Sequence, residues 1–153
     1  MTVLKQIFKE VPEDTNLIIL VEDSKKNSPI FDELKELPDV NFVNVGLELS
    51  RKLMHSRIET ITNPQYFFDE ILKNFNQERV IFYNIDILFD SNLEFNPLDI
   101  FKKISAQRKI ICIWNGSFSD NKLSYSKFGH SDYFSQSVDS KEASIIKTEE
   151  IES

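Results

Sequence analysis

The chain has 153 residues, a formal net charge of −7 and 41% hydrophobic residues, among them 13 Phe. This content is enough to bury a core, so disorder along the whole chain is excluded. The acidic balance also excludes general electrostatic attraction to nucleic acid, unless a local basic patch or a basic partner supplies it.

Five apolar runs separated by polar turns predict the strands of one sheet. They are Leu17–Val21, Phe42–Val45, the stretch led by Val80–Phe82, Ile110–Trp114 and the weaker Ala143–Lys147. The single cysteine, Cys112, lies in the fourth run, and we interpret it as a small core residue. One cysteine excludes a disulfide framework and a multi-cysteine zinc site.

The segments between these runs have the apolar spacing of helices. The predicted helices lie near Ile7–Val11, over Ile30–Leu37 with Pro38 as its stop, over Leu47–Met54, and after the pairs Asn63-Pro64 and Asn96-Pro97. Asn is a favourable cap and Pro suits the first helical position, so these two pairs are start signals.

Strands that alternate with helices predict a three-layer α/β fold with a mainly parallel sheet of about five strands. We expect one domain over residues 1–147 and an acidic, frayed tail over residues 148–153. No apolar run approaches the roughly 18 residues that a membrane span needs, so we expect a cytoplasmic protein without a membrane partner.

Ligands of such sheets lie beyond the carboxyl ends of the strands. The segment after the first strand offers Lys25, Lys26 and Ser28, which are the residue types of a phosphate-binding loop. None of the three glycines lies there, and Glu22 and Asp23 would repel a triphosphate. The segment is therefore either a solvated turn or an atypical nucleotide loop.

The third and fourth strands also end in polar residues. In phosphate-loop ATPases an Asp closes the third strand and holds Mg²⁺. Here Tyr83 takes that position and Asp86 follows three residues later, either as a water-mediated metal ligand or as a cap of the next turn. Asn115 ends the fourth strand, either as a sensor of the terminal phosphate or as a turn residue. We expect no cofactor, and ATP with Mg²⁺ is the alternative.

The polar stretch Asn115–Ser144 has interleaved aromatic residues and is interpreted as a long contact loop. We predict that Trp114, Tyr125, His130 and Tyr133 pack as one cluster that presents this loop to a partner. The other interpretation of His130 is that it only caps or packs the loop.

A second candidate contact is Arg51, in a basic helical cluster with Lys52, His55 and Arg57. Helical spacing puts Arg51 and His55 on one face. This cluster could meet phosphate or an acidic partner, or it is a solvated face.

Three stretches taken in order resemble the BrxF family, the small P-loop-containing proteins of type 3 BREX bacteriophage-defence systems. They are FVNVGLELSRKL (Phe42–Leu53), NIDILFDSNLEFNPLDIFKKIS (Asn84–Ser105) and WNGSFSDNKLSYSKFGHSDY (Trp114–Tyr133). The resemblance implies a P-loop-NTPase-like, AAA/RecA-like core with a nucleotide loop. It also implies membership of a multi-protein complex that includes a DNA methyltransferase.

This chain departs from the family at two places. The glycine-rich loop of the family would fall on Val21–Ser28 and its Mg²⁺ Asp on Tyr83, and both are missing. We therefore expect a degenerate member that is not an enzyme. It would be an accessory or scaffold subunit that acts through contacts with other proteins of the defence complex, with its oligomeric state left open.

Three alternatives remain. The first is a nucleotide-binding ATPase subunit with an atypical loop that uses Lys25, Lys26, Ser28, Asp86 and Asn115. The second is a receiver-like phosphoprotein, because LIILVEDS resembles the first strand of a receiver domain, with Glu22 and Asp23 as its acidic pair. The third is a relative outside these defence systems that shares their fold.

Overall fold

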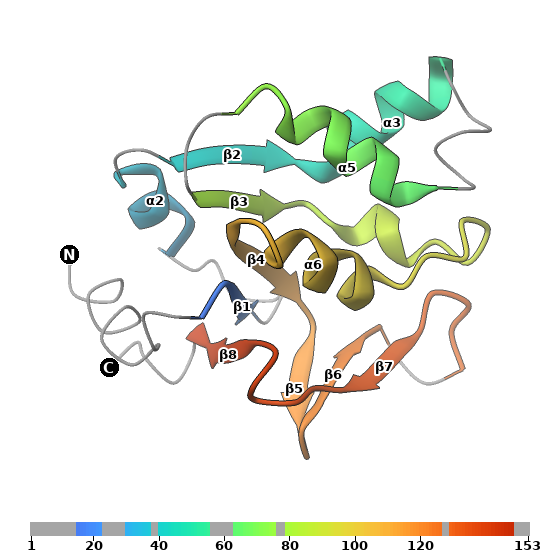
Figure 1. Ribbon diagram of the computed structural model, residues 1–153. Helices are drawn as coiled ribbons and strands as arrows, with labels where there is room; N and C mark the ends of the chain where they lie inside the picture. Colours follow the sequence, from blue (N-terminus) through green and yellow to red (C-terminus); the bar gives the residue numbers. More distant parts are fainter. Residues whose placement is uncertain are drawn as a thin grey trace.

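The computed structural model describes residues 15–22, 30–37, 40–55, 63–75, 79–126 and 129–148. Within them, one open sheet has five parallel strands in the order β2-β3-β4-β1-β8 (Figure 1). The strands are β1 (Leu17–Glu22), β2 (Val40–Asn44), β3 (Arg79–Tyr83), β4 (Lys109–Asn115) and β8 (Ser144–Lys147). The α/β class with a mainly parallel sheet is therefore confirmed.

Of the helices in the described residues, α5 and α6 begin at the two predicted start signals, and η1 was not predicted. They are α2 (Ile30–Lys35), α3 (Val45–His55), α5 (Pro64–Leu72), α6 (Pro97–Ser105) and the 3₁₀ helix η1 (Asp86–Phe89). The side chain of Asn63 accepts the backbone N–H of Tyr66 at 3.2 Å, and that of Asn96 accepts the N–H of Asp99 at 3.1 Å. One strand boundary was wrong, because Val45 begins α3 instead of ending β2. The helix predicted near Ile7–Val11 lies outside the described residues.

The two faces of the sheet bury different sets of side chains, because successive residues of a strand point to opposite faces. Leu17 and Ile19 of β1 join the larger core, which also includes buried residues of α3, α5 and α6. Ile18 and Leu20 join a smaller core that includes Leu34 of α2. Helices therefore cover both faces of the sheet in the described part of the chain.

The stretch interpreted from sequence as a contact loop contains a second sheet, so that prediction was wrong. Strands β5 (Ser117–Ser119), β6 (Lys122–Tyr125) and β7 (Phe134–Ser137) form an antiparallel meander. The turn between β5 and β6 has Asp120 at φ 52° and Asn121 at φ 61°. Two successive positive φ values are the geometry of the type I′ turn, whose twist matches that of a tight hairpin.

The meander packs against the end of β4 through one tryptophan. Trp114 is fully buried, and its indole N–H donates to the carbonyl oxygen of Ser124 at 3.0 Å. Gly116 makes this approach feasible, because a Cβ there would lie 2.2 Å from the same oxygen. The single tryptophan thus joins the two sheets and is core, not surface.

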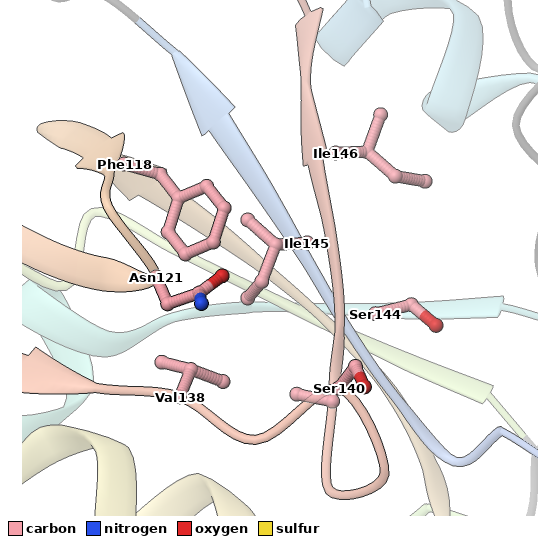
Figure 2. A pocket seen from close by; sticks show the side chains of 8 residues that line it. Phe118, Asn121, Val138, Ser140, Ser144, Ile145 and Ile146 are labelled. Atoms are coloured by element: carbon pink, nitrogen blue, oxygen red, sulfur yellow. The ribbon is translucent and has the colours of Figure 1, made fainter.

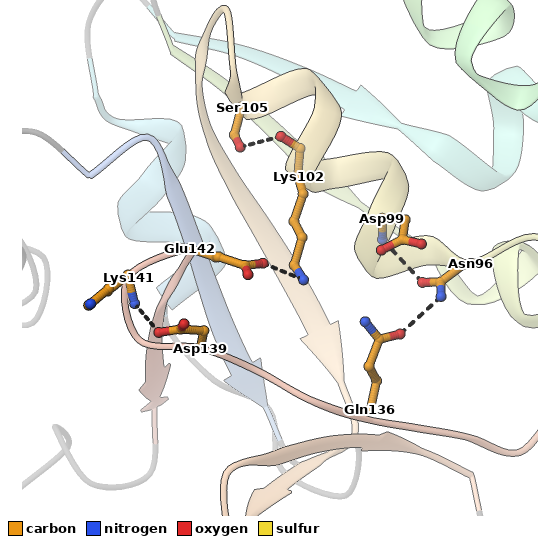
Figure 3. Close-up of polar contacts among 8 residues, drawn as sticks. All are labelled: Asn96, Asp99, Lys102, Ser105, Gln136, Asp139, Lys141 and Glu142. Atoms are coloured by element: carbon orange, nitrogen blue, oxygen red, sulfur yellow. Dashed lines mark hydrogen bonds and ion pairs between the residues drawn. The ribbon is translucent and has the colours of Figure 1, made fainter.

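Two polar contacts connect the segment from β7 to β8 with α6 (Figure 3). The amide of Asn96 donates to Gln136 at 2.9 Å, and Lys102 forms an ion pair with Glu142. The carboxyl end of α6 is also held, because Ser105 accepts the side-chain amide of Asn16 through its carbonyl oxygen at 2.8 Å.

The start of the predicted tail also needs correction. Thr148 is 4% exposed, and its hydroxyl donates to the carbonyl oxygen of Val21 at 3.3 Å. This residue therefore belongs to the folded domain. Among the described residues, no helix combines the length and the hydrophobicity that crossing a membrane requires.

Candidate functional site

The order of the strands brings the ends of β3 and β4 together at the carboxyl edge of the sheet. β4 lies between β1 and β3, and Glu22 at the end of β1 is paired with Asn115 at the end of β4. Asp86 begins η1 directly after β3. Residues far apart in the sequence thus meet at the edge where ligands of parallel sheets bind.

The turn between β3 and η1 is held by a neighbouring strand end. Asn84, at φ 54°, donates its side-chain amide to the side-chain oxygen of Asn44 at 2.8 Å. Its carbonyl oxygen accepts the N–H of Gly46 at 2.9 Å. A Cβ at Gly46 would lie 2.6 Å from the Asn84 amide nitrogen, so a larger residue there would displace the Asn84 side chain from Asn44. These contacts fix the direction in which the chain leaves β3 toward Asp86.

The Asp86 carboxyl lies in a cluster of polar groups. Partial burial raises its pKa, a hydrogen bond with the side chain of Asn115 lowers it, and the nearby Asp132 carboxylate raises it. The net pKa is above the usual value for an aspartate. Asp132 in turn accepts the hydroxyl of Ser126 at 2.7 Å, so this second carboxylate is also positioned by its neighbours.

The wall behind this cluster is aromatic. The ring of Tyr125 stacks on Phe89 with centroids 3.9 Å apart and planes 4° from parallel. Phe89 also contacts Trp114 and Phe134, at 5.1 Å and 5.6 Å between centroids. Burial raises the pKa of the Tyr125 hydroxyl, and the carboxylates of Asp86 and Asp132 raise it further.

An open hollow of about 780 Å³ lies between η1 and the turn that leads to β7. Its lining residues are Asp86, Ile87, Asp90, Ser91, Asn92, His130, Ser131 and Asp132. We call it the acidic hollow, because its described lining has three carboxylates and neither Lys nor Arg. Among the described residues, no group of three or more His, Cys, Asp or Glu side chains is arranged to hold a metal ion.

The acidic hollow therefore does not suit a phosphate chain. Phosphate sites use backbone N–H groups, lysine, arginine or a bound cation to balance the negative charge of the ligand. Three carboxylates around one open space disfavour such a ligand by like-charge repulsion. The same charge pattern suits a cationic group.

The position reserved for the Mg²⁺ Asp in phosphate-loop ATPases is occupied by an aromatic ring. Tyr83 lies 4.9 Å from Phe31 and 6.4 Å from Phe42 between ring centroids. These contacts belong to the core on the α2 side of the sheet. The ring thus packs between β2 and α2, and its position carries no carboxylate.

The structure brings only some of the predicted site residues together. Asp86 and Asn115 meet as described, and His130 lines the same hollow. Trp114 is buried and presents no surface to a partner. Tyr133 is 39% exposed in the turn before β7.

The other predicted site residues lie elsewhere. Arg51 is on α3, where it forms an exposed ion pair with Glu48 at 3.2 Å. Lys25, Lys26 and Ser28, and Asp23 of the proposed acidic pair, lie outside the described residues. Glu22 is described and half-buried at the end of β1.

Sequence reasoning missed three residues of this region: Phe89, Asp90 and Asp132. Phe89 lies in a 3₁₀ turn, whose spacing follows neither the helix period nor the strand period, so no hydrophobic pattern indicated it. Asp132 was assigned to a loop, so its approach to Asp86 was not visible. The signal that could have found it is Asp120-Asn121, a pair suited to the tight turn of a hairpin.

These features define an α/β protein with an open parallel sheet and a small antiparallel sheet packed at its carboxyl edge. Comparison with protein-family models, with curated proteins and with solved structures gave no match.

Proposed function

We propose that this protein is a non-hydrolysing, P-loop-like accessory or scaffold subunit of a BREX-type bacteriophage-defence complex, and that it acts through protein–protein contacts. The resemblance to the BrxF family supplies the biological context. Tyr83 carries the non-hydrolysing part of the proposal, because an aromatic ring packed against Phe31 and Phe42 occupies the position of the carboxylate that holds Mg²⁺ in phosphate-loop ATPases.

The strand order also supports this proposal. In the AAA/RecA-like core that the resemblance implies, the strand with the sensor residue lies between the phosphate-loop strand and the Mg²⁺ strand. Here β4 lies between β1 and β3, and Asn115 ends it. In chain order the sheet is 2-3-4-1-5, which differs from the 2-1-3-4-5 order of receiver-like proteins. The receiver alternative therefore disagrees with the fold.

Calorimetry with ATP and Mg²⁺, together with an assay for released phosphate, tests the non-hydrolysing part. We expect no binding heat in the micromolar range and no turnover. Micromolar binding with turnover would overturn the proposal.

Reconstitution with proteins encoded next to this one, among them a methyltransferase and a large ATPase, tests the scaffold part. A complex on size-exclusion chromatography supports it, and separate elution of all components contradicts it.

One observation favours the nucleotide-binding alternative. Asp86 and Asn115, which that alternative needs side by side, interact at the carboxyl edge of the sheet. The alternative predicts that replacing Lys25 and Lys26 together by Ala abolishes ATP binding, whereas Lys103→Ala on α6 leaves it unchanged. Binding that survives the double replacement contradicts it.

A further inference from the structure

One face of α3 exposes two large hydrophobic side chains, and between them lies Arg51, which forms an exposed ion pair with Glu48 of the same helix. Leu47 is 46% exposed and Met54 is 81% exposed, whereas the other side of the helix buries Leu49. Arg51 lies four residues after Leu47 and three before Met54, so the three side chains follow one stripe of the helix. We call this stripe the α3 face. Exposed apolar groups gathered around an arginine are typical of contact surfaces.

The same chain carries a surface with the complementary charge. The acidic hollow has the carboxylates of Asp86, Asp90 and Asp132, with Ile87 among them. The half-exposed ring of Tyr133 follows Asp132 directly in the chain. The hollow thus offers acceptors for a guanidinium and some apolar area for the side chains beside it.

The two surfaces lie on the same side of the molecule. α3 packs against η1, and η1 supplies Asp86 and Ile87 to the acidic hollow. In Figure 1, α3 and the start of β7 both lie toward the right of the view. A two-fold axis between two such molecules can set each α3 face against the other molecule's hollow, and two reciprocal contacts close the assembly.

We propose that a second copy of this chain covers the α3 face, with Arg51 of each copy in the acidic hollow of the other, in a closed two-fold dimer. Ion pairs at a surface contribute little affinity each but steer association and set its orientation. The affinity then comes mainly from the burial of Leu47 and Met54. The dimer is consequently weak, dependent on concentration and sensitive to salt.

Sedimentation equilibrium over a range of protein concentrations tests this proposal. Raising the ionic strength from about 0.01 M to about 0.15 M shortens the screening length from about 30 Å to about 8 Å. We expect the dissociation constant of the dimer to rise about tenfold over this range. A protein that stays monomeric at all concentrations in low salt would overturn the proposal, and so would a dimer whose affinity does not change with salt.

Charge reversal locates the interface. Arg51→Glu and Asp132→Arg should each abolish the dimer, because each places like charges in contact. The chain that carries both substitutions should dimerise again, because both reciprocal pairs are restored with inverted sign. Lys103→Glu on α6 changes the net charge as Arg51→Glu does and should leave the dimer intact.

A substitution at Met54 tests the apolar part without changing charge. Met54→Ser removes a side chain that is 81% exposed in the monomer, so folding should be unaffected and the dissociation constant should rise. Single reversals that leave the dimer intact, or a doubly reversed chain that stays monomeric, would contradict the proposed interface. None of these measurements uses ATP or another protein, so their outcome is independent of the proposed function.

Discussion

At the scale of single residues, two of the three glycines lie close to atoms that a side chain would meet. A Cβ at Gly116 would meet the carbonyl oxygen of Ser124 at 2.2 Å and the indole nitrogen of Trp114 at 2.8 Å. A Cβ at Gly46 would meet the amide nitrogen of the Asn84 side chain at 2.6 Å, and that side chain would have to move. Both glycines lie where the sheet meets the candidate site, and they allow close packing there. None of the three glycines of the chain lies in the segment where a phosphate-binding loop would fall.

Gly116→Ala should therefore destabilise the fold by about 3 kcal/mol, because the main chain must move and the bond from Trp114 to Ser124 is lost. Gly129→Ala is the matched control. Its φ of 94° makes a side chain strained, but no atom lies within 4 Å of the new Cβ. We expect it to cost only about 1 kcal/mol. Urea unfolding, followed by the fluorescence of the single tryptophan, measures the loss of stability in both variants. Equal losses would contradict the predicted clash between a Cβ at position 116 and Ser124.

The Asp86 carboxyl should make the stability depend on pH. Its pKa in the folded state is raised, first of all by burial, so between its ordinary value of 3.8 and the raised value the folded protein binds more protons than the unfolded chain. Stability contributed by this group is therefore lost as pH rises through that interval. Asp86→Asn removes the effect and keeps an acceptor for Asn115.

The expected result is a free energy of unfolding that Asp86→Asn raises more at about pH 7 than at about pH 4. Urea unfolding at both pH values measures the difference. Asp69→Asn on α5 is the control for the loss of one carboxylate. A gain of the same size at both pH values would contradict the role given to burial of Asp86.

At the scale of secondary-structure elements, the signals that worked were local. Continuous apolar runs located β1, β3 and β4, because strands that are buried on both faces have no polar alternation. Asn63-Pro64 and Asn96-Pro97 located the starts of α5 and α6 through their caps. The meander was not predicted, because its strands have only three or four residues and are rich in serine. Neither strand propensity nor a hydrophobic pattern indicates such strands.

The two capping asparagines differ in one contact, which gives a prediction. Within the described part of the chain, the side chain of Asn63 is hydrogen-bonded to α5 alone, whereas Asn96 caps α6 and also donates to Gln136 of β7. Asn63→Ala should cost about 1 kcal/mol. Asn96→Ala should cost about 2 kcal/mol, because the contact with the meander is lost as well.

The double variant of Asn96 and Gln136 shows whether that difference comes from their contact. Gln136→Ala alone should lower the free energy of unfolding by part of the extra cost of Asn96→Ala. The variant with both alanines should lose less stability than the two single variants added together. Equal costs for the two asparagines in thermal or urea unfolding would mean that the contact between α6 and β7 contributes nothing.

At the scale of the whole molecule, alternation of strands and helices predicted a parallel sheet, but it could not predict the order of the strands. That order depends on which long connections cross which face of the sheet, and no local pattern encodes it. The candidate site was predicted in part for the same reason. Asp86 and Asn115 were located because each follows an apolar run, whereas Asp132 reaches them only through the meander.

Amide hydrogen exchange should be slower in the five-stranded sheet than in the three-stranded sheet. β1 and β4 each have a hydrogen-bonded neighbour on both sides, and their central residues are fully or almost fully buried. Their amides should exchange only on global unfolding, whereas those of β5 and β7 should exchange through openings of lower free energy. Exchange measured by mass spectrometry or NMR checks this, and equal protection of both sheets would show that they open as one unit.

The place of β1 between β4 and β8 has a consequence during synthesis on the ribosome. Leu17 is paired with Ile110, so β1 finds its partner β4 only after about 90 more residues have been translated. Until then the run LIILV has no neighbour in the sheet and is exposed to aggregation or to capture by a nascent-chain chaperone. The five-stranded sheet should therefore form only after β4 and β8 have been translated.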